Sequence, residues 1–248
     1  MKDHNKHKFK GIITGFFHQL LQIDFIRYVL VRLRFIYFVK IKRRLKTLDQ
    51  VSKGVASNTI MHNMKGLSDY AAVRPLALIK PLSVIETLTK DATILSIGPR
   101  TEGELFSLVG YGFYAKNIRG LDLITYSPWV DIGDMHKMPY GDSSYDVIMA
   151  GWVIAYSHTP EIAAQEMIRV VKNGGIIAIG VQHTGHQKKE EILPYISGAG
   201  RETSRVDEIT DYFGDNIDHI YFHHEIVADR MSVKGSVLAI FSVKKQNE

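Results

Sequence analysis

The sequence has no cysteine, which excludes disulfides, iron–sulfur clusters, thiolate zinc sites, cysteine nucleophiles and lipid anchors attached through cysteine. It has no low-complexity tract and no repeat of the length used by solenoids and propellers. Long apolar runs are also missing, because the longest charge-free stretch near the N-terminus is residues 11–23 and a spanning helix needs about 20 apolar residues. No small-residue cleavage site follows that stretch. We therefore expect neither a simple transmembrane segment nor a signal peptide.

The composition is that of an ordinary globular protein, with 248 residues, of which 45% are hydrophobic and 23% charged. The charge is unevenly placed: residues 1–46 hold twelve Lys and Arg against two Asp, a net +10, and the remainder is −5. This asymmetry predicts a cationic helical arm at 1–46, a junction and leading helix at 47–91, and a globular domain at 92–248. Within that domain, residues 182–235 are expected to cover a ligand pocket.

The arm mixes large apolar side chains with cations throughout residues 9–46. Three interpretations stay open: a helix in the interface of an anionic membrane, a helix packed on the globule or on a partner subunit, and a platform for RNA or DNA. The membrane interpretation is favoured because so many apolar side chains stand beside so many cations. It predicts a cytoplasmic protein that is peripheral on the inner face of a membrane.

The globule alternates apolar, β-branched runs with helical patterns, which predicts a mainly parallel, doubly wound α/β sheet of seven strands, Rossmann-like, covered on both faces. Two final runs separated by a short turn predict a C-terminal antiparallel hairpin. A leading helix is expected from Asp69 to Thr89, interrupted by Pro75 and Pro81. The expected strands are 92–97, 117–123, 130–132, 146–150, 176–181, 219–227 and 236–243, and the expected helices of the domain are 102–109 and 161–171.

Open sheets of this kind bind ligands beyond the carboxyl ends of their strands. The first such end reads SIGPRTEGE and enters a helix, so Gly98 and Pro99 form a tight turn that brings backbone N–H groups toward a ligand. Arg100 stands where a pyrophosphate-binding loop would have its second glycine. A guanidinium there suits a ligand with a single carboxylate.

Two acids follow at neighbouring strand ends. Asp122, next to Leu123, is spaced from Gly98 as an acid that binds the two hydroxyls of a ribose would be. Asp134 follows a glycine at the next strand end, where its carboxylate can accept the amino group of an adenine while Met135 covers the ring. The pattern indicates an adenosine-containing ligand.

The order of SIGPRTEGE, GLD, DIGDMHKMPYGDSSYDVIMAGWVIAYS and EMIRVVKNGGIIAIG over residues 92–181 resembles the class I S-adenosylmethionine-dependent methyltransferases, in particular the methyltransferase type 11 group. The resemblance implies S-adenosylmethionine as cofactor. It assigns Gly98 to the loop around the methionine part, Asp122 to the ribose, Asp134 and Met135 to the adenine, and 172–175 to a turn before the fifth strand.

The sequence departs from the pattern of this family in two places. Ser96 stands where the family has an acid, and the chain between Asp122 and Trp129 is too short for the usual helix. Rearranged contacts are therefore expected, with Arg100 near the methionine carboxylate and Glu102 or Glu104 near its ammonium group.

Methyl transfer to a hydroxyl needs positioning and a base, for which histidine is suited. His158 and His183 follow the fourth and fifth strands, and His186 is a weaker candidate on the same loop. His158 could equally be a polar residue at a helix entry before Thr159 and Pro160.

The acceptor is expected to contact Tyr195 and Arg201 in the charged segment that follows the fifth strand. No metal site is expected, because His219 and His223 would lie about 13 Å apart on one strand. The leading hypothesis is O-methylation of a small or membrane-linked acceptor, such as a carbohydrate or glycolipid precursor. Nucleic acid is a less favoured partner, and oligomers are not excluded. The rivals are a nicotinamide-dependent reductase of the same fold and a non-catalytic RNA- or membrane-bound adaptor.

Overall fold

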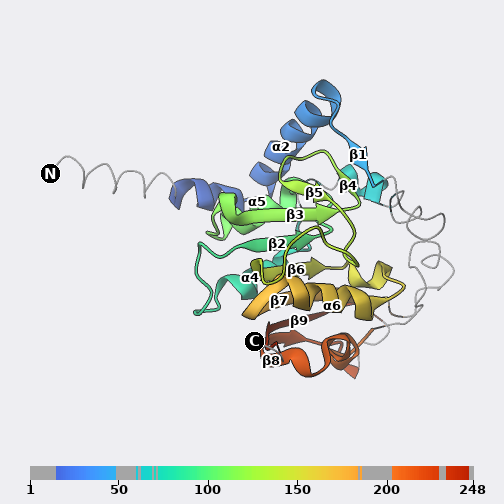
Figure 1. The fold of residues 1–248 in the computed structure, drawn as a ribbon. Helices are drawn as coiled ribbons and strands as arrows, with labels where there is room; N and C mark the ends of the chain where they lie inside the picture. The colour runs from blue at the N-terminus through green and yellow to red at the C-terminus, as the bar shows by residue number, and fades with distance from the viewer. Residues whose placement is uncertain are drawn as a thin grey trace.

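The computed structural model describes residues 15–48, 60, 63–68, 70, 72–183, 185, 203–228 and 233–245. Seven of its strands form one sheet in the order β5-β3-β2-β6-β7-β9-β8 (Figure 1). They are β2 (Ile94–Ile97), β3 (Ile118–Asp122), β5 (Val130–Ile132), β6 (Tyr145–Gly151), β7 (Val171–His183), β8 (Ile217–His224) and β9 (Gly235–Val243). The short strands β1 (Lys46–Thr47) and β4 (Ile124–Thr125) pair with each other.

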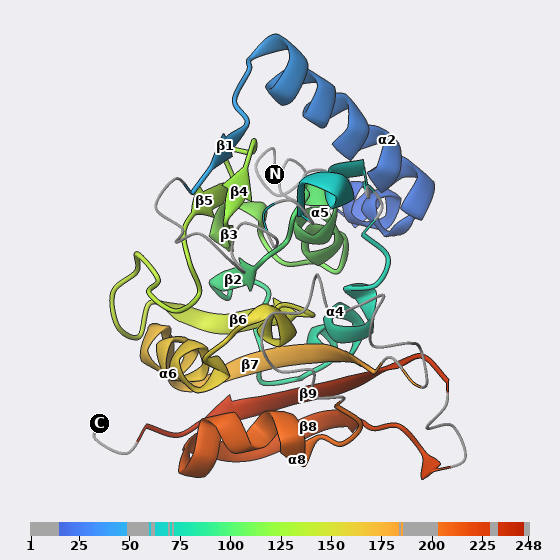
Figure 2. The same ribbon diagram turned by 90° about the vertical axis from the view of Figure 1, so that its right-hand side faces the viewer.

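The sheet is parallel from β5 to β7, and β9 is inserted antiparallel between β7 and β8. The predicted doubly wound sheet and its C-terminal hairpin are thus confirmed. Figure 2 shows β8 and β9 side by side at one edge of the sheet, with β5 at the other.

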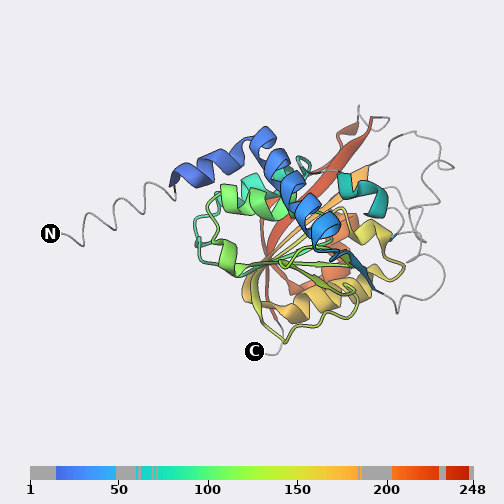
Figure 3. The same cartoon turned by 90° about the horizontal axis from the view of Figure 1, so that it is seen from above.

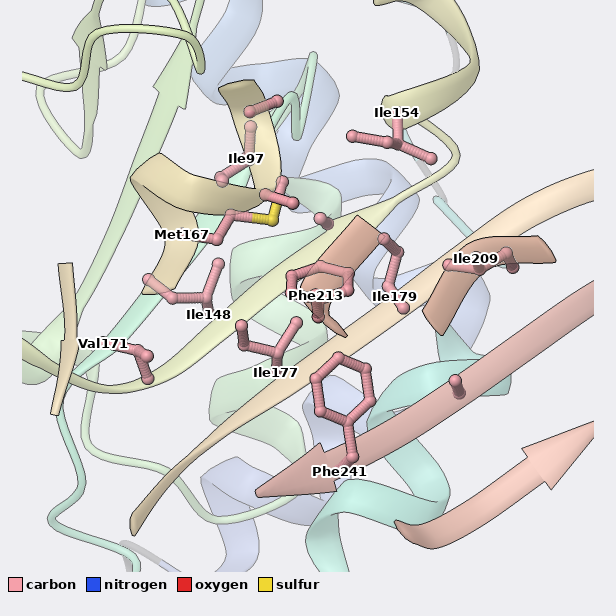
Figure 4. Packing of buried hydrophobic residues seen from close by; sticks show 14 of the residues in the cluster. Ile97, Ile148, Ile154, Met167, Val171, Ile177, Ile179, Ile209, Phe213 and Phe241 are labelled. Carbon is pink, nitrogen blue, oxygen red and sulfur yellow. The ribbon is translucent and has the colours of Figure 1, made fainter. Parts of the chain in front are cut away.

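Helices cover both faces of the sheet. One face carries α4 (Leu76–Ser83) and α5 (Glu102–Gly110), and the other carries α6 (Pro160–Val170) and α8 (Asp207–Thr210) (Figure 3). Because side chains alternate along a strand, β6 sends Val147 and Met149 into the first core and Ile148 and Ala150 into the second. Figure 4 shows the second core, in which Ile148 and Met167 of α6 pack above Phe213 and Phe241. The carboxyl ends of five parallel strands are held in one row by this packing.

The leading helix is shorter than predicted. Asp69 lies outside the described residues, Pro75 is the N-cap of α4, and the helix ends at Ser83, two residues after Pro81. Pro75 thus precedes the first helical residue, whereas Pro81 lies inside the last turn, where its missing N–H removes one bond to the preceding turn.

The described part of the arm packs on the globule, which agrees with the second of the three interpretations, a helix packed on the globule or on a partner subunit. Its residues 15–22 are helical, and α2 (Asp24–Phe35) follows directly. At one end of α5 the Gln22 amide donates to the carbonyl of Gly110 at 2.9 Å, and a Cβ on Gly110 would lie 3.0 Å from the Leu21 backbone. At the other end Arg34 binds Glu102. Among the described residues, no helix has the length and apolarity to cross a membrane.

Candidate functional site

The loop after β2 has a conformation that glycine normally supplies. Gly98 has φ +68°, and a Cβ there would lie 2.3 Å from the side chain of Val153. Arg100 also has positive φ, +55°, a region that costs a residue with a side chain about 1–2 kcal/mol. The loop therefore keeps the left-handed turn at position 100 although an arginine occupies it. Thr101 is the N-cap of α5, and its side chain accepts the N–H of Gly103.

Asp122 fastens this loop to the end of β3. Its Oδ2 accepts the backbone N–H of Arg100 at 2.9 Å, and its Oδ1 accepts the side-chain amide of Asn63 at 3.2 Å. Burial raises the pKa of Asp122 to about 6, against the lowering effect of hydrogen bonds from the backbone N–H groups of Arg100 and Ile124. The carboxylate is thus placed between the loop and the strand end, as expected for a group that binds a ligand above Gly98.

A second buried carboxyl lies behind the loop. Glu104 accepts a hydrogen bond from the hydroxyl of Ser96, the residue that stands where the related family has an acid. Its pKa is raised to about 7, mainly by burial and to a lesser extent by the charge of Asp122, while the hydrogen bond from Ser96 and the charge of Arg100 act in the lowering direction. An acid from α5 therefore reaches the strand end where the sequence has only a serine.

Glu102 is engaged elsewhere. Its oxygens accept hydrogen bonds from Arg34 Nε at 2.6 Å and Arg34 Nη2 at 2.8 Å, and from the hydroxyl of Ser127 at 2.5 Å. The side chain is fully buried and faces α2 rather than the loop. The predicted contact of Glu102 with the cofactor thus has no support in this geometry, because Arg34 of the arm binds its carboxylate. Sequence reasoning could not place the arm. Glu104 is the acid beside the loop.

Glu104→Gln is expected to stabilise the protein at alkaline pH. A carboxyl with a higher pKa in the folded than in the unfolded chain favours folding in its protonated form, so its contribution is lost as pH rises from about 4.5 to about 7. At pH 8 the variant should gain about 3 kcal/mol in free energy of unfolding, at about 1.4 kcal/mol per pKa unit, and at pH 4 almost nothing. Urea unfolding at both pH values measures this difference.

The exposed acid Glu161 is the matched control, since Glu161→Gln should change stability equally little at both pH values. A gain from Glu104→Gln that does not depend on pH would show that Glu104 does not titrate in this range.

Asp134 begins a chain of hydrogen bonds that the sequence did not reveal. His136 Nδ1 donates to Asp134 Oδ1 at 2.5 Å, and His136 Nε2 lies 2.6 Å from the Ser157 hydroxyl. The hydrogen bond from His136 lowers the pKa of Asp134, so the acid is charged and its other oxygen can accept an amino group. The order is that of a hydrolytic triad, but Ser157 is 2% exposed and accepts the N–H of Thr159. These hydrogen bonds thus hold Asp134 in position. The only feature of the sequence that could have indicated them is that His136 lies two residues after this acid.

The two histidines proposed as bases differ in access. His158 is exposed, directly before α6. His183 is fully buried at the end of β7, with Nδ1 3.0 Å from the carbonyl of Thr203. His158 therefore has the access that a base requires. The other predicted contacts with the acceptor, Tyr195 and Arg201, lie outside the described residues, as does His186.

The remaining predicted cofactor residues lie around the same loop. The ring of Pro99 is packed so closely on β3 that a Cβ on Gly120 would be 2.9 Å from it. Met135 is partly buried against the core of the α6 face, and the carbonyl of Leu123 accepts the N–H of Leu48. Asp122, at the end of β3, and Asp134, two residues after β5, lie at neighbouring strand ends.

Trp152 marks the end of the next strand, β6. It has φ +60°, its indole N–H is buried without a hydrogen-bond partner in the described part of the chain, and Arg74 stacks over its ring at 5.2 Å. Strained backbone often gathers at functional sites. Arg74 also donates to Gln182 of β7 at 3.4 Å, so it links the segment after β6 to β7.

Comparison with known proteins agrees with this geometry. Residues 113–179 match the model of a family described as "Methyltransferase domain". A 96-residue stretch is 29% identical to ribosomal RNA-processing protein 8 of Caenorhabditis briggsae. The matched stretch covers 39% of this chain and 29% of that protein. The chain thus matches less than a third of the length of this curated relative.

Solved structures share the fold. A chain of the complex between the Haloferax volcanii Trm112 methyltransferase activator and a methyltransferase aligns with a TM-score of 0.53 and 17% identity, over 79% of this chain and all of that one. A protein of Methanococcus maripaludis described as an S-adenosyl-L-methionine-dependent methyltransferase aligns with a TM-score of 0.50 and 18% identity, over 80% and 98% of the two chains.

Residues 113–179 thus match a methyltransferase domain and the chain shares the fold of class I methyltransferases, which confirms the resemblance seen in residues 92–181. S-adenosylmethionine is the cofactor of this class of domain.

Proposed function

We propose that the chain transfers a methyl group from S-adenosylmethionine to a hydroxyl of a small or membrane-linked acceptor, such as a carbohydrate or glycolipid precursor. One observation carries the proposal: Asp122 and Asp134 stand at neighbouring strand ends beside a left-handed loop. Of these, Asp122 would bind the ribose and Asp134 the adenine, while Arg100 and Glu104 would lie on the side of the methionine part.

The cofactor supplies an electrophilic methyl group, so the chain mainly has to align the acceptor and take up a proton. His158 is an exposed imidazole in the segment between β6 and α6, and it would accept the proton of the acceptor hydroxyl. Arg74, which precedes α4, and Gln182, near the end of β7, would hold polar groups of the acceptor.

RNA is the second candidate acceptor. It is favoured by the similarity to a protein named for ribosomal RNA processing and by the net charge of +10 in residues 1–46. A non-catalytic adaptor on RNA or a membrane remains the alternative from a different class, because Arg100 replaces a loop glycine.

Calorimetric binding of S-adenosylhomocysteine, followed by transfer of a labelled methyl group, tests the proposal. The full chain should bind this product and label a fraction of lipids or saccharides. His158→Gln should lower turnover by about 100-fold and leave the affinity for the product unchanged, whereas His224→Gln, an exposed control on β8, should change neither. Labelling of RNA alone would establish the second candidate, and failure to bind the product would leave only the adaptor.

A further inference from the structure

Helix α2 has two apolar faces, of which the globule uses one. Arg27 and Val31 are fully buried toward the globule. Phe25, Val29 and Leu33 follow one another at intervals of four residues, which places them in one row on the opposite side. Phe25 is 73% exposed and Leu33 61%. Figure 3 shows α2 along the outside of the molecule, with α5 beneath it. The outer face of α2 is therefore apolar where a surface helix is normally polar.

Other exposed apolar side chains lie in the same part of the chain. Of the eighteen large hydrophobic side chains that are exposed in the described residues, nine lie between Phe16 and Ile41. Single exposed apolar residues need no explanation, whereas a contiguous group marks a contact surface.

Exposed cations flank the same surface. Arg32 lies beside the row on α2, and Lys40, Lys42 and Arg44 follow it. The one acid of the helix, Asp24, is paired with Arg27. An apolar face bordered by long cationic side chains is complementary to a bilayer with anionic headgroups, because the stems can lie along the acyl boundary while the charges reach phosphates.

We propose that the outer face of α2, with Phe25, Val29 and Leu33 at its centre, docks in the interface of an anionic bilayer. The 12 residues of α2 span about 18 Å, and its inner face is packed on α5, so the helix lies parallel to the surface. The row itself offers no hydrogen-bonding side chains, which does not suit RNA, and the net +10 of residues 1–46 opposes close approach of a second copy. The proposal is independent of methyl transfer.

Co-sedimentation of the full chain with vesicles tests this docking. The probes are vesicles of phosphatidylcholine with phosphatidylglycerol, and vesicles of phosphatidylcholine alone. The test variant carries Phe25→Ser and Leu33→Ser. The matched control carries Val84→Ser and Ile162→Ser, two exposed apolar residues outside the arm. A third variant carries Lys40→Gln and Lys42→Gln. Circular dichroism of each variant shows that the fold is retained.

We expect binding to the anionic vesicles, a loss of about tenfold or more in the Phe25/Leu33 variant, no change in the control, and a weakening in the Lys40/Lys42 variant that disappears at high salt. Any of three results would overturn the proposal: no binding to anionic vesicles, equal binding by the Phe25/Leu33 variant, or self-association that this variant abolishes without any vesicle binding. Capture of single-stranded RNA in place of vesicles would also overturn it and assign the surface to nucleic acid.

Discussion

Replacing Arg34 with alanine is expected to lower the free energy of unfolding by about 3 kcal/mol. The guanidinium binds both oxygens of the fully buried Glu102 carboxylate and stacks near the rings of Phe38 and Trp129. Its removal leaves a buried charge without its main partner, which is one of the most destabilising changes known. For a chain of this length the melting temperature should fall by about 6–12 °C, measured by calorimetry.

Arg32 provides the matched control, because it lies on the same helix and is exposed. Arg32→Ala should change stability by less than about 0.5 kcal/mol. Adding Glu102→Gln to Arg34→Ala should restore part of the loss, since the second change removes the stranded charge. Equal melting of the Arg34 and Arg32 variants would mean that the ion pair does not hold the arm.

Asp122→Ala is expected to weaken binding of S-adenosylhomocysteine by at least about 100-fold, or about 3 kcal/mol. Two losses combine. The variant has no carboxylate to accept the ribose hydroxyls, and the backbone N–H of Arg100 loses the acceptor that fastens the left-handed loop. The measurement is calorimetric titration of the ligand into the folded variant, near neutral pH.

Asp215→Ala, an exposed acid at the far edge of the sheet, should bind the product as the unaltered chain does. If the Asp122 and Asp215 variants bind equally well, the nucleoside is not held at the end of β3, and the proposed cofactor site must lie elsewhere.

The sheet could be predicted from sequence because its signals are local. Short β-branched runs such as 92–97 end in glycine and are followed by helical periodicity, and a parallel crossover has one allowed hand. The positions of Asp122 and Asp134 follow from the same logic, since Asp122 lies at the end of such a run and Asp134 two residues after one. The family resemblance then added the identity of the ligand, which spacing alone left open.

The arm could not be placed in the same way. Its contact with α5 depends on Gln22 and Arg34 meeting Gly110 and Glu102, residues far away in the chain. No periodic pattern encodes such a pairing. Sequence reasoning therefore predicts a ligand contact for Glu102 instead of its ion pair with Arg34. The Ser96–Glu104 hydrogen bond and the link through His136 were missed for the same reason. Each depends on side chains that converge only after the sheet has formed.

The docking of the arm on α5 has a consequence for synthesis of the chain. Residues 15–35 leave the ribosome well before the last residue of their partner helix, Gly110. At about 5–20 residues per second, this interval is roughly 4–15 s. During this interval α5 is not yet available to cover the inner face of α2 and to pair with Arg34. The nascent chain therefore exposes an apolar, cationic segment to chaperones and anionic surfaces before the globule has formed.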